Sequence, residues 1–544
     1  MRPIEEVGAG LGLSPDDLIP YGRTKAKIRL RVLETHRRAP RGKLVVVSSI
    51  TPTPAGEGKT TTTIGLGQAL GRLKRRAVIA LREPSIGPIM GVKGGGTGGG
   101  RAQVIPHDEI NLHFTGDLHA VAAAHNLLAA VLDNHLYHDN PLRIDPRQIL
   151  WRRVIDMNDR ALRHVVVGLG GRTQGVPHEG GFLITAASEV MALLCLAEDL
   201  ADLKERLRRI LVAFTYDGEP VLAEALKVAG AMTALLREAL QPNLVQTLEG
   251  TPALVHGGPF ANIAHGCNSV LATKMALALG ELCVTEAGFG FDLGAEKFFD
   301  IKCPTAGLSP DAVVLVASVR ALKYHGGVAI RELDREDPGA LTRGFPNLEK
   351  HVEDTRLFGV PLVVAINRFP SDTPAELEVL REHCAALGIP AAVTDVHREG
   401  GAGGIALAEC LLDLLATTPS RFRPLYDWSL PVKEKIRLIA TRMYGASAIY
   451  YTRRAERDIE QINKLGYSGL PICMAKTPRS LSDDPALRGR PEDFTVTVDE
   501  VGISAGAGFL VPITGEIMTM PGLPKRPAAE QIDMDEAGNI LGLG

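Results

Sequence analysis

The chain has 544 residues, of which 45% are hydrophobic and 23% charged, and its net charge of −3 excludes a disordered chain and a strongly basic nucleic-acid-binding protein. No apolar stretch reaches the roughly 18 to 20 residues that cross a bilayer. The acidic N-terminus also differs from a signal peptide, so we predict a cytoplasmic protein without membrane association. The seven cysteines are dispersed and the pair His135 and His138 is isolated, so neither a disulfide framework nor a transition-metal site is predicted.

Short apolar runs alternate with longer segments of helical periodicity along the chain. The runs predict buried strands at residues 43–50, 77–81, 165–168, 282–286, 312–318 and 360–367. The periodic segments predict helices at residues 189–211, 221–240, 262–279, 373–387, 405–415 and 432–444. Because buried strands separated by helices form parallel sheets, the pattern predicts an α/β fold with a doubly wound, mainly parallel sheet.

The first predicted strand leads into a candidate phosphate-binding loop. Its residues are Thr53, Pro54, Ala55, Gly56, Glu57, Gly58, Lys59 and Thr60. The glycines let backbone N–H groups point inward, Lys59 brings a positive charge, and Thr60 offers a hydroxyl to a nucleotide-bound Mg²⁺. The strict pattern has glycine at position 53, so this loop is a variant. It predicts ATP binding and a sheet of the phosphate-loop NTPase type, with additional smaller α/β domains.

Arg82 directly follows the second predicted strand, residues 77–81. In a doubly wound sheet this strand end faces the phosphate loop, so Arg82 can reach an anion beside the γ-phosphate of ATP. The alternative is a surface salt bridge. Further along, seven of the ten residues 91–100 are glycine, and their position after a strand favours a loop at the substrate site over a flexible linker.

Two later strand ends also carry residues that suit a ligand site. Glu286 ends the run 282–286, where phosphate-loop enzymes place an acidic group that holds Mg²⁺. Phe289 follows on a turn flanked by glycines, and such an aromatic residue either fills the core or stacks on a flat ligand. Phe369 follows the run 360–367 in the same way.

Several long strings of the sequence occur in a distinctive order. They are TPAGEGKTTTTIGL, LREPS, INLHFTGD, TEAGFGFDLGAEKFFDIKC, CMAKTPRSLSDDP and TMPGLP. Together they resemble formate tetrahydrofolate ligase, also called formyltetrahydrofolate synthetase. The resemblance runs from about residue 5 to the C-terminus, including a Pro- and Gly-rich tail that by itself predicts irregular structure.

The resemblance implies that formate attacks the γ-phosphate of MgATP to give formyl phosphate, which then formylates tetrahydrofolate. The products are 10-formyltetrahydrofolate, ADP and phosphate. By this resemblance Lys59 and the loop amides hold the phosphates, Thr60 holds the metal and Arg82 holds formyl phosphate. Asp117, in the string FTGD, matches a residue near the formate site.

The resemblance also implies a stacking slot for the folate, in which Phe289 and Phe369 match two aromatic residues. At the third position the family usually has Trp, whereas this chain has His397. A second departure is Arg101, where the family commonly has Tyr. A His ring offers a smaller face than an indole, which predicts weaker or altered folate binding.

We expect residues 1–105 and 225–340 to form the nucleotide-binding core, with residues 106–224 as an inserted α/β segment. Residues 341–544 are expected to form a C-terminal α/β region that contributes to the folate site. The resemblance further implies a homotetramer and activation by a monovalent cation, K⁺ or NH₄⁺.

Two other functions fit parts of the sequence. One is a phosphate-loop ATPase switch that drives a partner protein, although such switches often carry paired cysteines or a second lysine early in the loop, and neither occurs here. The other is a ligase for another small carboxylate or pterin, which His397 favours.

Overall fold

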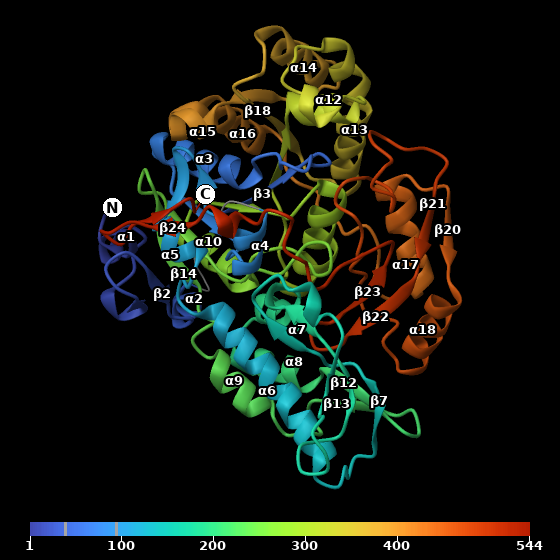
Figure 1. The fold of residues 1–544 in the computed structure, drawn as a ribbon. Coiled ribbons are helices and arrows are strands. Elements are labelled where there is room, and N and C mark those ends of the chain that lie inside the picture. The colour runs from blue at the N-terminus through green and yellow to red at the C-terminus, as the bar shows by residue number, and fades with distance from the viewer. Residues whose placement is uncertain (37–40, 93–95, 544) are drawn as a thin grey trace.

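The computed structural model describes residues 1–36, 41–92 and 96–543. The chain is an α/β protein built on one large mixed sheet with several smaller sheets (Figure 1). Within the described residues, seven neighbouring strands of the large sheet are parallel, in the order β15 (Pro252–Val255), β4 (Ala77–Leu81), β16 (Leu282–Glu286), β3 (Lys43–Ser49), β17 (Ala312–Ala317), β18 (Leu362–Asn367) and β19 (Ala391–Thr394). The predicted α/β fold with a mainly parallel sheet is therefore confirmed.

The parallel strands are apolar throughout because helices cover both faces of the sheet. Successive residues of β3, Val45 and Val46, point to different apolar clusters. The cluster around Val45 includes residues of α3 (Lys59–Arg72) and α16 (Ile405–Thr417). The cluster around Val46 includes residues of α10 (Val270–Leu279). Each strand residue thus removes apolar surface from water on one face or the other.

One side of the large sheet is antiparallel. Here β14 (Asn243–Thr247) runs antiparallel to β15, β2 (Ala26–Ile28) and β6 (Ala102–Ile105), and β1 (Leu18–Pro20) pairs with β2. At the opposite side, β18 and β19 come from the region expected to form the C-terminal unit, yet they are part of the same sheet.

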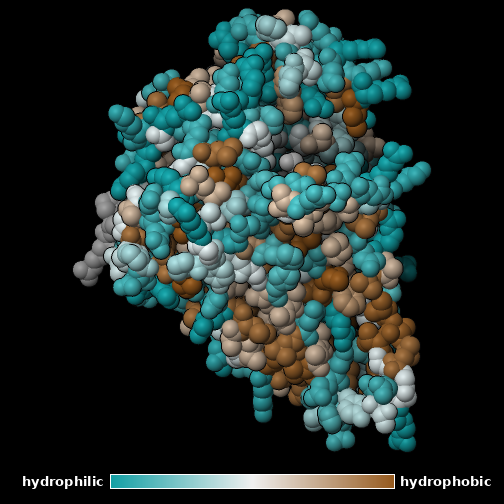
Figure 2. Space-filling view, turned by 60° about the vertical axis from the view of Figure 1, so that its left-hand side comes forward, coloured by the Kyte–Doolittle hydropathy of each residue, from teal (hydrophilic) through white to brown (hydrophobic). Residues whose placement is uncertain are grey.

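The segment that follows β6 protrudes at the bottom of Figure 1. It contains α6 (Asp117–Tyr137) and a three-stranded sheet of β7 (Ile144–Ile149), β12 (Leu211–Thr215) and β13 (Pro220–Leu222). Figure 2 shows apolar side chains gathered on the lower part of the molecule. The exposed apolar residues of this segment include Tyr137, Leu150, Val166, Leu169 and Tyr216. Exposed apolar surface of this kind is typical of contact sites for other molecules.

The strand predicted at residues 165–168 forms, but the prediction that it is buried was wrong. These residues form β9 (Val165–Val167), which pairs antiparallel with β10 (His178–Gly180) in a separate two-stranded sheet. Val166 is 60% exposed. The β-branched residues favour a strand, but β9 pairs with β10, on the far side of residues 168–177, and not with a strand of the large sheet.

The predicted helix boundaries were wrong at four places. Residues 189–211 form two helices, α7 (Glu189–Leu196) and α8 (Leu200–Arg208), because the Asp199 side chain accepts the N–H of Asp202 and caps a new helix. Of residues 221–240, only α9 (Ala229–Leu236) is a regular helix. Within residues 262–279 the helix begins at α10, and residues 432–444 divide into α17 (Val432–Leu438) and a π-helical turn, Ile439–Tyr444. The helices predicted at 373–387 and 405–415 are confirmed as α14 (Pro374–Ala386) and α16.

The Pro- and Gly-rich tail packs against the inserted segment. The N–H of Ile184 donates to the carbonyl oxygen of Thr519 at 3.0 Å, and Arg163 Nε donates to that of Met520 at 2.9 Å. Met520 is buried. The described chain then ends in a short hairpin of β24 (Asp533–Met534) and β25 (Ile540–Leu541).

Among the residues that the structure describes, one helical stretch is long and apolar enough to cross a membrane, contrary to the expectation from the sequence. It covers Val396–Thr417 and has a mean hydropathy of 1.3. Within it, the buried residues Leu407, Leu411 and Leu415 of α16 pack against strands of the large sheet. The apolar face of α16 therefore belongs to the core of the α/β domain. A core helix of this kind passes the same test of length and composition as a membrane-spanning helix.

Candidate functional site

The candidate phosphate loop connects β3, in the middle of the parallel sheet, to the first turn of α3. Two of its residues, Gly56 and Gly58, have left-handed φ values of +82° and +70°. A Cβ atom on Gly58 would lie 2.6 Å from Asn367 Nδ2, so a side chain is excluded there. The loop therefore delivers the N-terminus of α3 to the carboxyl edge of the sheet, where free backbone N–H groups attract anions.

Glu57 holds the loop in this shape. Its Oε1 accepts the N–H of Thr53 at 2.7 Å, and its Oε2 accepts the hydroxyl of Ser318. Its own carbonyl oxygen accepts Asn367 Nδ2 at 3.0 Å. Because the amide of Thr53 donates to Glu57, residue 53 takes part in the hydrogen bonds that hold the loop in this shape. The sequence signal for Ser318 and Asn367 is a polar residue that ends or follows an apolar strand.

Four predicted site residues come together at the carboxyl edge. Lys59 Nζ lies 3.3 Å from Ser49 Oγ at the end of β3. Thr60 Oγ1 donates to Glu286 Oε2 at 2.7 Å, and Arg82 Nη2 lies 3.7 Å from Glu286 Oε1. This grouping follows from the strand order, because β16, which ends at Glu286, lies between β4 and β3. The sequence did not indicate Ser49 as part of this group.

The side chains at this edge can bind a phosphate group and a metal ion. Arg82 is 26% exposed at its side chain, so its guanidinium can reach a ligand, and its ion-pair partner Glu286 lies 3.7 Å away. Thr60 and Glu286 supply a hydroxyl and a carboxylate oxygen, which are ligands that Mg²⁺ prefers. The arrangement therefore fits a nucleotide with its metal.

Asp117 lies apart from this group, in a buried ion pair. Its Oδ1 is 2.7 Å from Lys27 Nζ, and its Oδ2 accepts Asn243 Nδ2 at 2.7 Å. Lys27 and Asp117 are both buried. Asp117 also acts on Glu83, the residue next to Arg82. Burial raises the pKa of Glu83 well above its usual range, and the charge of Asp117 raises it further.

Replacing Lys27 by alanine is expected to destabilise the fold by about 3–5 kcal/mol, because Asp117 would be left as an unpaired buried charge. Chemical denaturation of both proteins measures the loss. The control is Lys433→Ala, which removes an exposed partner of Glu456 and should cost less than about 1 kcal/mol. Equal losses in the two variants would contradict the role of burial.

Phe289, one of the three predicted stacking residues, is hydrogen-bonded to the end of β3, the strand that leads into the phosphate loop. Its carbonyl oxygen accepts Ser49 Oγ at 3.2 Å, and its φ of +56° is unusual for a non-glycine residue. Phe369 follows β18 and is half-buried, with Arg320 Cζ 5.0 Å from its ring centroid. Since β3 and β17 lie between β16 and β18, the strands that carry Phe289 and Phe369 are about 14 Å apart at a spacing of ~4.8 Å.

His397 follows β19, the neighbour of β18, and lies in the short helix α15 (Val396–Glu399). Its carbonyl oxygen accepts the N–H of Arg101 at 2.8 Å. Both side chains are exposed. The two positions at which this chain departs from the resemblance are therefore direct neighbours, which the sequence did not indicate.

The described part of the glycine-rich segment explains why glycine is required beside His397. Residues 93–95 lie outside the described residues, so the prediction of a substrate-site loop is tested only in part. Gly100 has a φ of +58°, and a Cβ atom there would lie 2.1 Å from the carbonyl oxygen of His397. A Cβ atom on Gly99 would lie 3.3 Å from His397 Cδ2 and 3.9 Å from Thr61 Oγ1. Glycine thus permits the backbone to pass between α15 and the start of α3.

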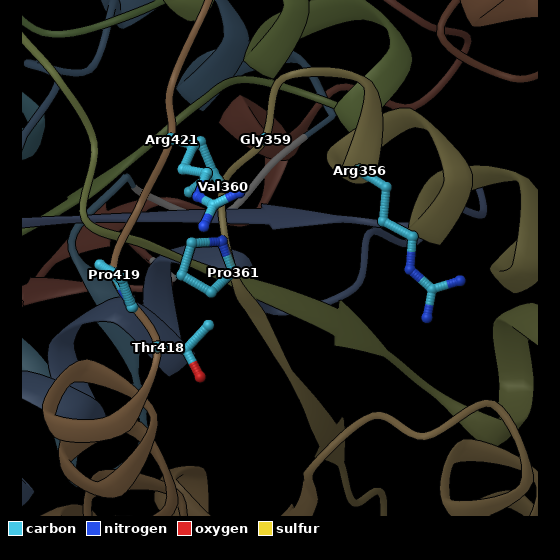
Figure 3. Close-up of a pocket in the computed structure, with 7 residues that line it drawn as sticks. All are labelled: Arg356, Gly359, Val360, Pro361, Thr418, Pro419 and Arg421. Carbon is cyan, nitrogen blue, oxygen red and sulfur yellow. The ribbon is translucent and has the colours of Figure 1, made fainter.

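A pocket of about 350 Å³ lies elsewhere, at the amino end of β18 (Figure 3). Pro361, which precedes β18, lines it together with Thr418 and Arg421, and the side chain of Arg356 extends away from these residues. Parallel strands bring their ligands to the carboxyl edge, so this pocket is on the opposite edge from the phosphate loop. None of the predicted site residues lines it.

Comparison with protein families identifies one match that spans the chain. The family model described as formate–tetrahydrofolate ligase matches residues 1–544.

Proposed function

Because the chain belongs to the formate–tetrahydrofolate ligase family, whose members use ATP to formylate tetrahydrofolate, we propose that Lys59, Thr60 and Arg82 form its phosphoryl-transfer site. The chain is an ATP-dependent ligase of folate one-carbon metabolism, with formate, tetrahydrofolate and ATP as substrates. The assignment rests on two contacts of Glu286 at the start of α3, the hydrogen bond from Thr60 and the ion pair with Arg82.

In the proposed first step a formate oxygen attacks the γ-phosphorus of ATP, and the bond between this phosphorus and the ADP oxygen breaks. The products of this step are formyl phosphate and ADP. Lys59 and the N-terminal amides of α3 neutralise the charge on the phosphates, and Arg82 holds the transferred group. Covalent attachment to the protein is not required.

In the second step N10 of tetrahydrofolate attacks the formyl carbon. The bond from this carbon to the phosphate oxygen breaks, inorganic phosphate leaves, and the nitrogen loses its proton. Phosphate leaves more easily than the oxygen of free formate, which is the reason for the activation. Phe289, Phe369 and His397 provide stacking surfaces for the folate in this proposal.

Thr60 and Glu286 are the residues that would hold the Mg²⁺ of ATP, which neutralises phosphate charge. Asp117 has both oxygens bonded in the structure, so we assign it an indirect role in positioning the strand end that carries Arg82. Activation by K⁺ or NH₄⁺, a homotetramer and a cytoplasmic location complete the proposal. The exposed apolar side chains of the inserted segment support contact with another copy of the chain.

The assay that tests the function combines the protein with MgATP, formate and tetrahydrofolate and measures formyltetrahydrofolate and ADP. Both products should form in equal amounts and require all three substrates. Turnover of ATP without formyltetrahydrofolate would favour an ATPase switch. Formylation that proceeds only with another pterin, or acylation from another carboxylate, would favour the alternative ligase that the adjacent Arg101 and His397 support.

Replacing His397 by tryptophan is expected to lower the KM for tetrahydrofolate by about threefold to tenfold, because a larger aromatic face adds stacking energy. Steady-state kinetics at saturating ATP and formate measure this KM. The control is His138→Trp, at an exposed position after α6, which should leave it unchanged. An unchanged KM in both variants would assign His397 a structural role beside Gly100.

A further inference from the structure

The loop of residues 257–266, which follows β15, lies directly beside Arg82. The N–H of Glu83 donates to the carbonyl oxygen of Gly257 at 2.8 Å. Arg82 Nη1 donates to the carbonyl oxygen of Pro259 at 3.5 Å. The backbone and the guanidinium of this strand end therefore both contact the loop, so the position of the loop affects where the guanidinium lies.

Gly288, two residues after β16, packs between the same loop and Arg82. Its N–H donates to the carbonyl oxygen of Gly266 at 3.1 Å. A Cβ atom on Gly288 would lie 2.5 Å from Ala261 Cβ and 3.0 Å from Arg82 Nη1. Because no room remains between these groups, a displacement of the loop by a fraction of an ångström shifts the guanidinium as well.

A fully buried lysine, Lys297, holds the loop. Its Nζ donates to the carbonyl oxygen of Ala261 at 2.5 Å and to that of Ala264 at 3.3 Å. The thiol of Cys473 is a further neighbour of the ammonium group: burial raises the pKa of this thiol to about 11, and the charge of Lys297 opposes the rise. Burying an ammonium group is costly unless hydrogen bonds replace its water, and here the carbonyl oxygens of one loop replace it.

The backbone around Lys297 directs a second buried lysine to the same region. Lys302 Nζ donates to the carbonyl oxygen of Asn268, just after the loop, at 2.8 Å, and lies 3.0 Å from Asn268 Oδ1. Residues five apart in an α-helix point about 140° away from each other. The stretch Phe298–Lys302 is instead π-helical, and its wider turn brings Lys297 and Lys302 closer to one side.

We propose that Lys297 is a positioning residue for phosphoryl transfer, because its ammonium group fixes the loop of residues 257–266 and thereby the place of the Arg82 guanidinium. This inference rests on the proposed function, since it assumes that Arg82 binds the transferred phosphoryl group. The phosphate loop is held separately, by Glu57 and Asn367. Loss of Lys297 should therefore act on turnover and leave ATP binding intact.

The test compares Lys297→Met with the wild-type protein. Methionine keeps an unbranched side chain but removes the donors to the loop. We expect kcat to fall by about 10- to 100-fold, as a small misplacement of a catalytic group can cause, and the KM for ATP to change by less than about twofold. The control is Lys435→Met in α17. Lys435 is equally buried, and its Nζ donates to the backbone carbonyl oxygens of Trp428, Ser468 and Leu470. Both variants should lose stability in chemical denaturation, whereas Lys435→Met should keep kcat within about twofold.

A double-mutant cycle with Arg82→Ala distinguishes positioning of Arg82 from a general loosening of the fold. If Lys297 acts through Arg82, Lys297→Met should lower kcat by less than about twofold once Arg82→Ala is present. A loss by the same factor in both backgrounds would overturn the proposal, as would an unchanged kcat in Lys297→Met alone. If Lys297→Met does not fold, Lys297→Gln, which keeps an N–H donor on a shorter uncharged side chain, replaces it in the cycle and decides in the same way.

The proposed function and this inference can fail separately. A low kcat in Arg82→Ala together with a normal kcat in Lys297→Met would retain the phosphoryl-transfer site and reject the role of Lys297. A normal kcat in Arg82→Ala would reject the site as proposed, and with it any positioning of Arg82. Wild-type protein that forms no formyltetrahydrofolate would reject both.

Discussion

Replacing Lys59 by alanine is expected to lower kcat by about 10²- to 10³-fold, as is usual when a charged group is removed from a preorganised site. Lys59 is the first residue of α3, directly after the left-handed Gly58, so the helix N-terminus and the ammonium group act on the same phosphates. Steady-state formation of formyltetrahydrofolate and of ADP measures the loss, and both rates should fall together.

Two variants make the interpretation of Lys59→Ala specific. Lys59→Arg keeps the charge but changes its shape and reach, so it should recover only part of the activity. Arg75→Ala removes an exposed positive charge after the other end of α3 and should leave kcat within about twofold, because salt and distance screen its effect on the site. A loss in Lys59→Ala no greater than that in Arg75→Ala would remove Lys59 from the mechanism.

Replacing Arg82 by alanine is expected to lower kcat by at least about 10²-fold, with a smaller change in the KM for ATP. The guanidinium lies at the carboxyl end of β4 beside Glu286, so its loss removes a planar donor for the transferred phosphoryl group. The measurement is formate-dependent ADP formation at saturating ATP, together with formyltetrahydrofolate formation.

The sheet itself supplies a matched control for Arg82. Arg76 and Glu281 stand just before the same two strands, β4 and β16, with Arg76 Nε 3.8 Å from Glu281 Oε1 at the opposite edge. Arg76→Ala removes the same kind of pair without touching the proposed site, so kcat should be unchanged within about twofold, as expected of an exposed ion pair. Equal rates in the two alanine variants would show that Arg82 has no special role.

Much of the fold was predictable because it depends on local sequence. The apolar runs at β3, β4, β16, β17 and β18 are buried on both faces, and this makes them recognisable without knowledge of their neighbours. The run at residues 165–168 has the same composition but forms the half-exposed β9. The composition of a run does not determine which strand that run will pair with. The short strands β14, β15 and β19 lack a strong periodic signal and were missed.

The sequence by itself determined the local conformations and the chemical character of the site. Gly56 and Gly58 adopt left-handed backbone, and Lys59 and Thr60 begin a helix. Arg82 follows a strand and Glu286 ends one, and each of these features follows from residues close in the chain. Only the tertiary structure decided which strand ends are neighbours. The order β4, β16, β3 brings Glu286 to Thr60 and Arg82. The packing of other elements buries Asp117 against Lys27 and places Arg101 beside His397. These contacts join residues far apart in the chain, and the packing of the whole sheet fixes them, so no local pattern contains them.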